Sequence, residues 1–311
     1  MRAFRSFVSR LQRFSLENDG MILQEESCML LPELDVVIVN YNAGDTLRVC
    51  VESVLASKGV RVRCIIIDNA SVDGSTDFCL EYSAAQVLLV SNSENVGFSS
   101  AVNQGIAFSE GDWVMLLNPD ATVFVSSLQE LLTVAQKTTA GVGAFGCLVR
   151  NPDMSEQRGC RRDIPTPAKV LAHAVGLHHI FPSLQFNHTD RPLPSDVQLV
   201  DAISGSCMLL NRQAYNEIGG FDESYFLHFE DLDYCVRLHA SNWQVMFVPF
   251  IEIEHLQGVS SAQAPVQVIL HKHRSMLRFF YKYAGVQKIL LPILIPLILL
   301  RALGQIVRVY Y

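Results

Sequence analysis

The chain has 311 residues, half of them hydrophobic, with a net charge of −7 and a mean hydropathy of +0.24. The four basic residues before Glu17 and the seven after Glu254 are accompanied by no acidic residue, whereas 31 acidic and 13 basic residues lie between them. This split argues against a uniformly solvated surface and indicates an acidic body that two basic ends hold against an anionic surface. Because both ends are also apolar, we expect that surface to be a membrane, with no nucleic-acid partner.

The first segment, residues 1–33, is predicted to be a basic N-terminal arm. Residues 1–16 place apolar side chains at helical spacing with arginines between them, which predicts an amphipathic helix. Such a helix suits a membrane interface, and the same periodicity suits a helix docked on the body of the protein. The arginines also replace the continuous apolar stretch of a secretory signal, so we expect a cytosolic location.

From Leu34 onwards, short β-rich runs alternate with helix-like segments. The predicted strands are 34–40, 62–68, 87–90, 113–118 and 142–149. The predicted helices between them are 44–57, 74–84, 99–109 and 126–138. Each helical segment has the length that a crossover between parallel strands needs. We therefore expect an α/β fold, with a Rossmann-like, mainly parallel sheet flanked by helices.

The second half of the chain is less regular. A Pro-rich stretch at 151–196 precedes predicted strands at 206–211 and 243–249, and a helix is expected to begin near residue 212. Residues 289–300 form an uninterrupted apolar run. As a helix this run is about 18 Å long, short of the roughly 30 Å of a bilayer core, so we do not expect a span. Its two prolines favour a kinked, interfacial or re-entrant element, with a buried core helix as the alternative.

The cysteines indicate a reducing compartment. The eight of them include no CxxC pair, and several lie in apolar runs such as "VRCIIID" and "GSCMLL". We expect them to be small buried hydrophobic residues rather than disulfide partners.

The loops after the strands limit the kind of ligand. The first strand runs into "NYNAGD", which has neither GxGxxG nor GxxxxGK[ST] and so lacks the glycine cradles of dinucleotide-binding and P-loop enzymes. The second strand ends in "DNASVDGS", whose acid and amides suit hydrogen bonds to a base and a ribose. In "LLNPDA", Asp120 follows another strand end, where open α/β sheets bind ligands. An ordinary turn is the alternative there, because Asn, Pro and Asp are common turn residues.

These runs belong to a series of seven motifs in a fixed order. The motifs are "VVIVNYN" (36–42), "IDNASVDGS" (67–75), "NVGFSSAVNQGI" (95–106), "LLNPDA" (116–121), "SGSCMLLNR" (204–212), "GGFDESYFLHFEDLDYCVRL" (219–238) and "HLQG" (255–258). The series resembles the family 2 inverting glycosyltransferases of the GT-A fold, and within them the bacterial rhamnosyltransferase-like branch. The resemblance covers about residues 34–283 and implies a GT-A domain at 34–258. The acid-free, apolar composition of 259–311 predicts a membrane-associating segment after it.

The resemblance implies a donor site at the carboxyl ends of the strands. The residues that it places against the nucleotide sugar are Asn40, Tyr41, Asn42, Asp68, Asn95, Gly97, Asn103 and Asn118. Asp120 stands where related enzymes carry an Asp-x-Asp motif, and we expect it to meet a divalent metal, Mg²⁺ or Mn²⁺, on the diphosphate of the donor. His255 matches a position that completes the metal shell in some relatives, with a core-edge histidine as the alternative. A hard cation held there would neutralise the charge that develops on the leaving diphosphate.

The resemblance also implies an acceptor side. In "FLHFEDLDYCVRL" it assigns Asp231 as the general base for the acceptor hydroxyl, with Glu230 beside it. Crowding of the two acids and partial burial are expected to raise the pKa of one of them, whereas Asp233 is expected to pair with Arg237. The other residues expected on this side are Arg158, Arg161, Arg162, Gly205 and Asp222. We expect the three arginines to meet an anionic acceptor such as a lipid diphosphate, with a solvated basic loop as the alternative.

The expected activity is metal-assisted, inverting transfer of L-rhamnose from dTDP-rhamnose to a lipid-linked or polysaccharide acceptor in cell-surface glycan synthesis. The expected location is the cytoplasmic face of the inner (plasma) membrane, as a peripheral or monotopic protein. Small changes in a pocket set the donor base and sugar, so transfer of another hexose from a UDP- or GDP-sugar stays open, as does the oligomeric state. A sugar-nucleotide nucleotidylyltransferase is less favoured, because no Gly-rich loop with a downstream Lys follows "VIVN". The presence of Asp120, Asp231 and His255 argues against a scaffold without chemistry.

Overall fold

The computed structural model describes residues 31–138, 141–189, 191–256, 258 and 265–310. Pro32–Tyr311 forms one compact unit. The helix predicted at 1–16 lies outside the described residues, and so does Cys28. The seven described cysteines are free and buried, as the sequence predicts.

Within the described residues, a nine-stranded sheet forms the centre of this unit. Its strands, in spatial order, are β3 (Val87–Ser91), β2 (Arg61–Asp68), β1 (Glu33–Asn40), β4 (Trp113–Leu117), β10 (Cys207–Asn211), β6 (Val142–Arg150), β11 (Gln244–His255) and β5 (Ala121–Val123), with β8 (Gln198–Leu199) paired to β11. The first four are mutually parallel, β10 is antiparallel to both β4 and β6, and β11 is parallel to β6. The expected α/β sheet is confirmed. Its parallel strands β1, β2 and β4 end at one edge, where ligands of such sheets bind.

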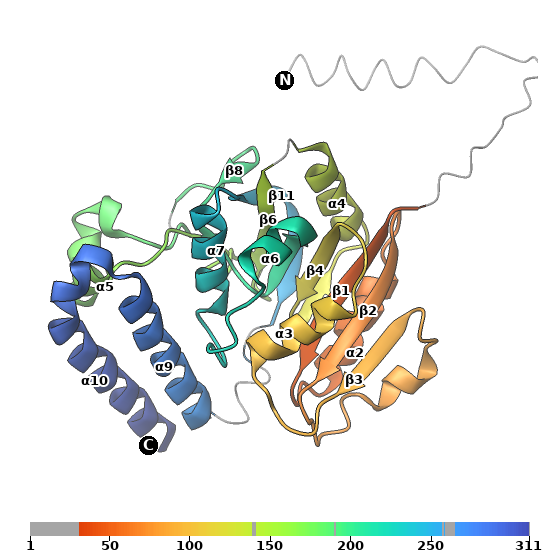
Figure 1. Cartoon of the computed structure of the whole chain (residues 1–311), viewed down its shortest axis with the longest axis horizontal. Helices are drawn as coiled ribbons and strands as arrows, with labels where there is room; N and C mark the ends of the chain where they lie inside the picture. The colour runs from red at the N-terminus through yellow and green to blue at the C-terminus, as the bar shows by residue number, and fades with distance from the viewer. Residues whose placement is uncertain (1–30, 139–140, 190, 257, 259–264, 311) are drawn as a thin grey trace, which may run out of the picture. The chain divides into compact units, whose positions relative to one another are not determined.

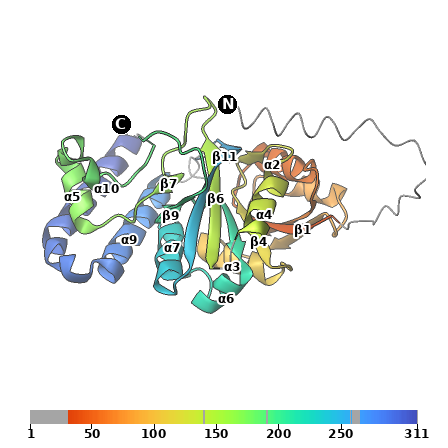
Figure 2. The same ribbon diagram turned by 90° about the horizontal axis from the view of Figure 1, so that it is seen from above.

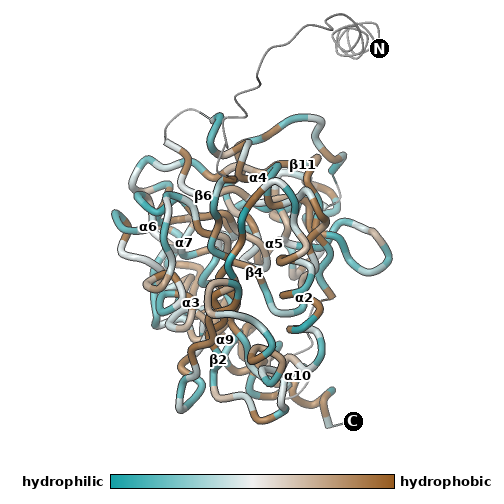
Figure 3. The backbone as a smooth tube through the Cα atoms, turned by 90° about the vertical axis from the view of Figure 1, so that its right-hand side faces the viewer, coloured by the Kyte–Doolittle hydropathy of each residue, from teal (hydrophilic) through white to brown (hydrophobic). Residues whose placement is uncertain are grey.

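Helices cover both faces of the sheet (Figures 1 and 2). One face carries α2 (Asp45–Leu55) and α4 (Ser127–Lys137), and the other carries α3 (Phe98–Ala107), α6 (Arg212–Ile218) and α7 (Glu230–Ala240). Each helix buries one apolar stripe; in α2 the buried side chains recur at helical spacing from Leu47 to Val54. The contrast between apolar strands and mixed helices can be followed in Figure 3. The sheet is thus covered on both sides and presents its polar groups at its edge.

The connection between β2 and β3 differs from its prediction. The helix expected at 74–84 is only a short 3-10 helix, η1 (Asp77–Glu81). The preceding loop is tied down first, because Asp73 accepts hydrogen bonds from Gly44 N at 2.8 Å and Ser75 N at 3.0 Å. These bonds keep the chain in a turn up to Ser75, so helical structure begins only at Asp77, after this turn.

β11 is longer than the strand expected at 243–249, since it continues to His255. It pairs first with β6, shifts register midway, and then pairs with the short β5. A bulge of this kind bends a strand and changes where its later side chains point. The extension sets His255 opposite Ala121, the neighbour of Asp120.

The irregular stretch after β6 and the C-terminal segment of the chain form a second group of elements. These are β7 (Arg161–Arg162) paired with β9 (Ala202–Ile203), α5 (Pro167–Ala174), η2 (Leu177–His179), η3 (Pro182–Leu184), α9 (Pro265–Tyr283), η4 (Gly285–Leu290) and α10 (Leu291–Tyr310). α9 and α10 lie side by side, and α5 contacts η4 and α10 (Figures 1 and 2).

The length expected for the C-terminal helix is wrong. α10 does not end with the apolar run 289–300 but continues past Arg301 to Tyr310, with Pro296 inside it. Arg301 is exposed, so its charge stays in solvent and does not end the helix. Among the residues described, Gly285–Tyr310 is the one helical stretch long and apolar enough to cross a membrane, by length and composition alone.

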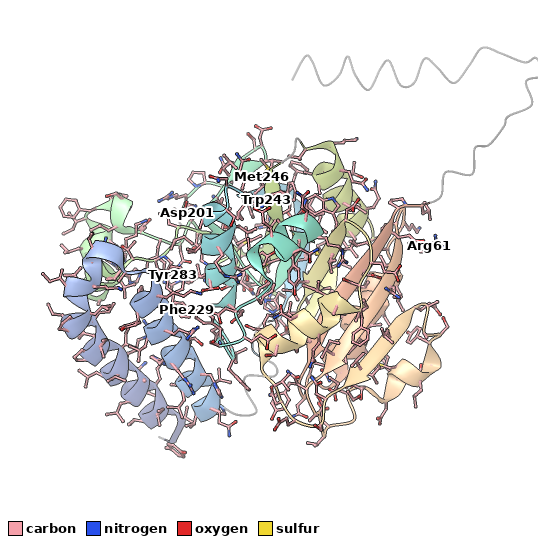
Figure 4. All side chains as sticks on the ribbon, viewed as in Figure 1. Arg61, Asp201, Phe229, Trp243, Met246 and Tyr283 are labelled. Atoms are coloured by element: carbon pink, nitrogen blue, oxygen red, sulfur yellow. The ribbon has the colours of Figure 1, made fainter. Side chains whose placement is uncertain are left out.

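A buried polar cluster fastens α9 to α7. Asp233 of α7 is fully buried and accepts hydrogen bonds from Lys282 Nζ and Tyr283 Oη, both at 2.7 Å. Lys282 also pairs with Asp222 at 2.9 Å. Phe229, just before α7, packs against Phe279 and Phe280 of α9. Figure 4 labels Phe229 and Tyr283 in the region between α7 and α9. Separating α9 from α7 would leave the buried carboxylate of Asp233 without Lys282 and Tyr283, which is strongly destabilising. The cluster therefore keeps α9 packed on α7.

Candidate functional site

The carboxyl ends of β1 and β2 carry a buried polar pair. Asn40 and Asp68 are the last residues of these strands and lie opposite each other, with Asn40 Nδ2 donating to Asp68 Oδ1 at 2.8 Å. The same Nδ2 reaches the hydroxyls of Ser71 at 3.0 Å and Ser75 at 2.9 Å. Both members of the pair are buried, so these bonds orient the Asp68 carboxylate in advance of any ligand. Direct contact of either residue with a nucleotide stays a prediction.

The loop after β1 is tied to the loop after β2. Asn42 Oδ1 accepts from Val72 N, and Asn42 N donates to Ser71 Oγ, each at 2.8 Å. Asn42 and Ala70 have positive φ angles of 50° and 62°. A left-handed backbone at residues other than glycine costs about 1–3 kcal/mol and persists only when its surroundings enforce it. The expected base-binding loop, with half-buried Tyr41 in it, is therefore held in one conformation.

The segment before α3 packs closely against the loop that leads into α7. Gly97 has a φ of 87°, and a Cβ there would lie 2.8 Å from the Phe226 ring, so only glycine fits. Asn95 Oδ1 accepts from Gly97 N at 3.0 Å. Asn103 exchanges two hydrogen bonds with the backbone of Phe221, both at 2.9 Å. Asn103 thus fastens α3 to this loop, and its contact with a donor stays a prediction.

The structure brings Asp120 and His255 together at the end of β4. Asp120 Oδ1 lies 2.9 Å from His255 Nε2, and both side chains are buried. Asn118 Nδ2 lies 3.1 Å from the same ring nitrogen. The other ring nitrogen, Nδ1, lies 2.6 Å from Gln157 Oε1.

Gln157 sets the tautomer of His255. Its Nε2 donates to the backbone carbonyl of His255 at 3.1 Å and to Asn151 Oδ1 at 3.0 Å, which fixes the orientation of the amide. The Oε1 atom must then face the ring, so Nδ1 carries a proton, and Nε2 is the ring nitrogen that faces Asp120. Sequence reasoning missed Gln157, because it lies in the irregular stretch, 98 residues from His255 and in no recognisable motif.

The Asp120–His255 pair suits a divalent metal. A carboxylate oxygen and a neutral imidazole nitrogen are both acceptors, so their approach to 2.9 Å requires a proton or a cation between them. Oxygen and imidazole ligands suit Mn²⁺, and Mg²⁺ completes its shell with phosphate oxygens and water. No group of three or more His, Cys, Asp or Glu residues that could hold a metal exists in the part of the chain that the structure describes. The pair therefore fits a metal shared with a bound diphosphate better than a complete protein cage.

α7 begins directly after a strained turn. His228 and Phe229 have φ angles of 65° and 69°, and the turn is held by the packing of Phe229 on α9. Glu230 and Asp231 occupy the first turn of α7, where the positive end of the helix dipole favours acidic side chains. This strained turn places the carboxylates of Glu230 and Asp231 next to each other at the start of α7.

Asp231 is held by three donors. Its Oδ1 accepts from Leu232 N at 2.7 Å, and its Oδ2 accepts from Gly205 N at 3.1 Å and forms an ion pair with Arg162. A Cβ at position 205 would lie 3.3 Å from Asp231 Cβ, so a larger residue there would press on the carboxylate. A carboxylate has about four acceptor positions, which leaves one on Oδ1 for a further donor such as a hydroxyl.

Glu230 is the acid with the raised pKa that the sequence predicts. Its Oε2 is buried and has no hydrogen-bond partner within the described residues. Burial, followed by the charge of Asp231, raises the pKa of Glu230 to about 8. At neutral pH Glu230 is therefore mostly protonated.

The three predicted acceptor-side arginines occupy different environments. Arg162 pairs with Asp231. Arg161 is buried and pairs with Glu156 at 2.8 Å, so it supports the loop. Arg158 is exposed.

Two further acids take structural partners. Partial burial opposes ionisation of Asp222, but hydrogen bonds from Lys282 and Arg278 of α9 prevail and lower its pKa. Asp233 pairs with Arg237 at 2.7 Å, as the sequence predicts. Asp222 therefore faces α9, and its predicted role toward an acceptor stays a prediction.

Comparison with known proteins agrees with this arrangement. The family described as glycosyl transferase family 2 matches residues 35–219. The N-acetylglucosaminyl-diphospho-decaprenol L-rhamnosyltransferase of Mycobacterium tuberculosis is 32% identical over 256 residues, which are 78% of this chain and 82% of the relative. The rhamnosyltransferase WbbL of Escherichia coli is 24% identical over 71% of this chain and 82% of its own.

Two solved structures share the fold. The mannosyltransferase PcManGT from Pyrobaculum calidifontis, in complex with GDP-Man and Mn²⁺, has a TM-score of 0.53 and 15% identity, and the match covers 96% of this chain and 81% of that one. GalNAc-T7 with UDP, GalNAc and Mn²⁺ also has a TM-score of 0.53, with 17% identity over 73% of this chain and 44% of that one. At these identities the likeness concerns the fold alone.

Glu230→Gln should flatten the pH dependence of stability. The pKa of Glu230 is about 8 in the folded protein against an ordinary value of 4.5, so between these values the folded state binds more protons than the unfolded state. Relative to the variant, the wild-type free energy of unfolding should therefore fall as the pH rises from about 5 to about 8 and then level off. Urea denaturation across this range measures it, with the exposed Glu94→Gln as a control that should follow the wild type. If the free energies of unfolding of wild type and Glu230→Gln differ by the same amount at every pH, the result contradicts a buried, protonated Glu230.

Proposed function

The chain belongs to glycosyl transferase family 2, and from this membership we propose that it transfers L-rhamnose from a dTDP-linked donor to a lipid-linked acceptor that carries a diphosphate. The names of the two rhamnosyltransferase relatives support the sugar, and the name of the mycobacterial relative supports the diphosphate-linked lipid. The product would serve cell-surface glycan synthesis.

The observation that carries this proposal is a dipeptide that joins the two halves of the site. Gly205 N donates to Asp231 Oδ2 at 3.1 Å, and the carbonyl of Ser206 accepts from Asn118 N at 3.0 Å. Asn118 is two residues from Asp120, so the metal-side pair and the carboxylate of Asp231 are held through adjacent backbone groups. A donor diphosphate at Asp120 and an acceptor hydroxyl at Asp231 would meet across this dipeptide.

On the donor side, Asp120 and His255 would hold a divalent metal, with Gln157 keeping the His255 Nε2 lone pair available. When bound, the metal would supply positive charge to the leaving diphosphate. Asn40 and Asp68, fixed to each other at the ends of β1 and β2, would hydrogen-bond the base or ribose of the nucleotide.

On the acceptor side, Asp231 acts as the general base. The acceptor hydroxyl donates to the remaining position on Asp231 Oδ1, its oxygen bonds to the anomeric carbon, and its proton passes to the carboxylate. The bond from the anomeric carbon to the phosphate oxygen breaks, and the nucleoside diphosphate leaves. Glu230, protonated at neutral pH, is suited to donate a hydrogen bond beside this reaction rather than to accept the proton. One base and direct displacement give inversion at the anomeric carbon.

We also propose that the protein attaches to the cytoplasmic face of the inner membrane, as a peripheral or monotopic protein. The segment after Glu254 has no acidic residue, and α10 carries several largely exposed apolar side chains, including Leu300 and Leu303. Apolar area next to cationic charge is the combination that binds anionic lipid surfaces. The basic arm at 1–33 would add a second attachment.

Asp120→Asn should weaken metal-dependent donor binding by more than about tenfold, because a neutral amide replaces the anionic ligand while the shape of the site is kept. Calorimetry with dTDP-rhamnose, with and without Mn²⁺, measures the effect. Asp112→Asn, an exposed position just before β4, is the control and should bind like wild type. Equal wild-type affinity in Mn²⁺ and in EDTA would refute the metal role.

Asp231→Asn should reduce turnover by about 10²–10⁴-fold, the usual contribution of a positioned base. Donor affinity should stay near wild type, because the expected nucleotide contacts lie at β1, β2 and β4. Glu230→Gln should reduce turnover less, since an amide can still donate the hydrogen bond. Single-turnover rates of both variants measure the difference. An inactive Glu230→Gln beside an active Asp231→Asn would move the base by one residue.

Leu300→Glu with Leu303→Glu should shift the protein from the membrane pellet to the supernatant. Leu300 is 63% exposed and Leu303 58%, so the exchange removes lipid-facing area without emptying the core. Phe250→Glu, on a side chain 56% exposed on β11, is the matched control and should leave the distribution unchanged. High salt should release some wild-type protein because it screens the charges. Protein that resists carbonate extraction would instead indicate an embedded helix.

A further inference from the structure

Four cationic side chains lie close enough for their charges to interact, and one of them, Arg162, pairs with Asp231. Arg158 lies in the loop between β6 and β7, Arg162 lies in β7, Lys272 lies on α9, and Arg301 lies on α10. Burial lowers the pKa of Lys272, and the positive charges of Arg301, Arg158 and Arg162 lower it further. Figures 1 and 2 show α5, α9 and α10 gathered on the same side of α7. We call these four residues the cation cluster.

The cation cluster is incompletely neutralised by the protein. Arg162 shares the carboxylate of Asp231, yet its Nε is buried without a hydrogen-bond partner within the described residues. Lys272 is half-buried, and the charges that act on it come from three arginines and from no acidic side chain among the described residues. Arg158 and Arg301 are exposed, whereas Arg162 and Lys272 are like charges that are partly desolvated, a cost that a bound anion would offset.

We propose that the cation cluster binds the diphosphate of the acceptor, an assignment of the ligand that rests on the proposed function. Arginine presents a planar fork of N–H groups to phosphate oxygens, and lysine adds a compact charge. Arg162 belongs to the cluster and also pairs with Asp231, so a sugar attached to the bound diphosphate lies beside the base. Exposed Leu300 and Leu303 flank Arg301, which lets the lipid chain leave the site along the apolar surface of α10.

The cluster extends the acceptor site beyond residues 35–219, the part of the chain that matches the family model. Lys272 and Arg301 lie on the C-terminal helices, outside residues 35–219. The C-terminal helices would thus supply part of the acceptor site in addition to membrane attachment. An anionic lipid headgroup has the same phosphate chemistry, so the experiment must separate the two sources.

The first arm of the test uses inorganic pyrophosphate, with EDTA present to remove the metal that would draw it to Asp120. Calorimetry should give binding to wild type, and Lys272→Gln and Arg301→Gln should each weaken it by about tenfold or more, the effect of one lost charged hydrogen bond. Arg274→Gln and Arg308→Gln, exposed cations on the same two helices, are the matched controls and should bind like wild type. Unchanged binding in the Lys272 and Arg301 variants would overturn the proposal.

The second arm uses transfer and vesicles. Both cluster variants should raise KM for a diphosphate-linked N-acetylglucosamine lipid at near-normal kcat, and they should leave KM unchanged for an alkyl N-acetylglucosaminide that lacks phosphate. If the variants keep the wild-type KM for the acceptor but no longer bind phosphatidylglycerol vesicles, the cluster binds lipid headgroups and the proposal fails. Pyrophosphate binding requires no donor, so a protein that binds it through the cluster but transfers no rhamnose would refute the proposed function and keep the anion site.

Discussion

The Gly205–Ser206 backbone is the constraint on which the site depends. One of its groups holds Asp231 and the next holds Asn118, so the carboxylate that opens α7 and the strand end that carries Asp120 cannot move independently. Because Gly205 has no side chain, Asp231 can lie against it. The antiparallel placement of β10 between β4 and β6 is what brings this dipeptide to the carboxyl edge of parallel strands.

Around this constraint, unfavourable local features are offset by packing elsewhere. The turn at His228 and Phe229 is strained, and Glu230 is buried without a partner for one oxygen. Aromatic contacts of Phe229 and the hydrogen bonds of Asp233 with Lys282 and Tyr283 hold the turn in place from α9. The C-terminal helices therefore support the reaction site as well as any attachment to a membrane.

Much of the fold follows from local patterns in the sequence, because apolar runs with polar ends mark parallel strands that are buried on both faces. Asp120 was recognisable for the same reason, as an acid directly after such a run. The missed features depend on interactions between distant segments: Gln157 orients His255 across 98 residues, and the charges of arginines from two other segments act on Lys272. The extension of β11 and the shortness of η1 likewise arise from pairing and loop hydrogen bonds that no single segment encodes.

The central claim is that one carboxylate drives a direct displacement between a nucleotide sugar and a diphosphate-linked acceptor. The most direct test is the NMR assignment of the new glycosidic bond made by the full-length protein from dTDP-rhamnose and a diphosphate-linked N-acetylglucosamine lipid. The account predicts a single product whose anomeric configuration is opposite to that of the donor. A product with retained configuration, or no rhamnose on the acceptor, would contradict it.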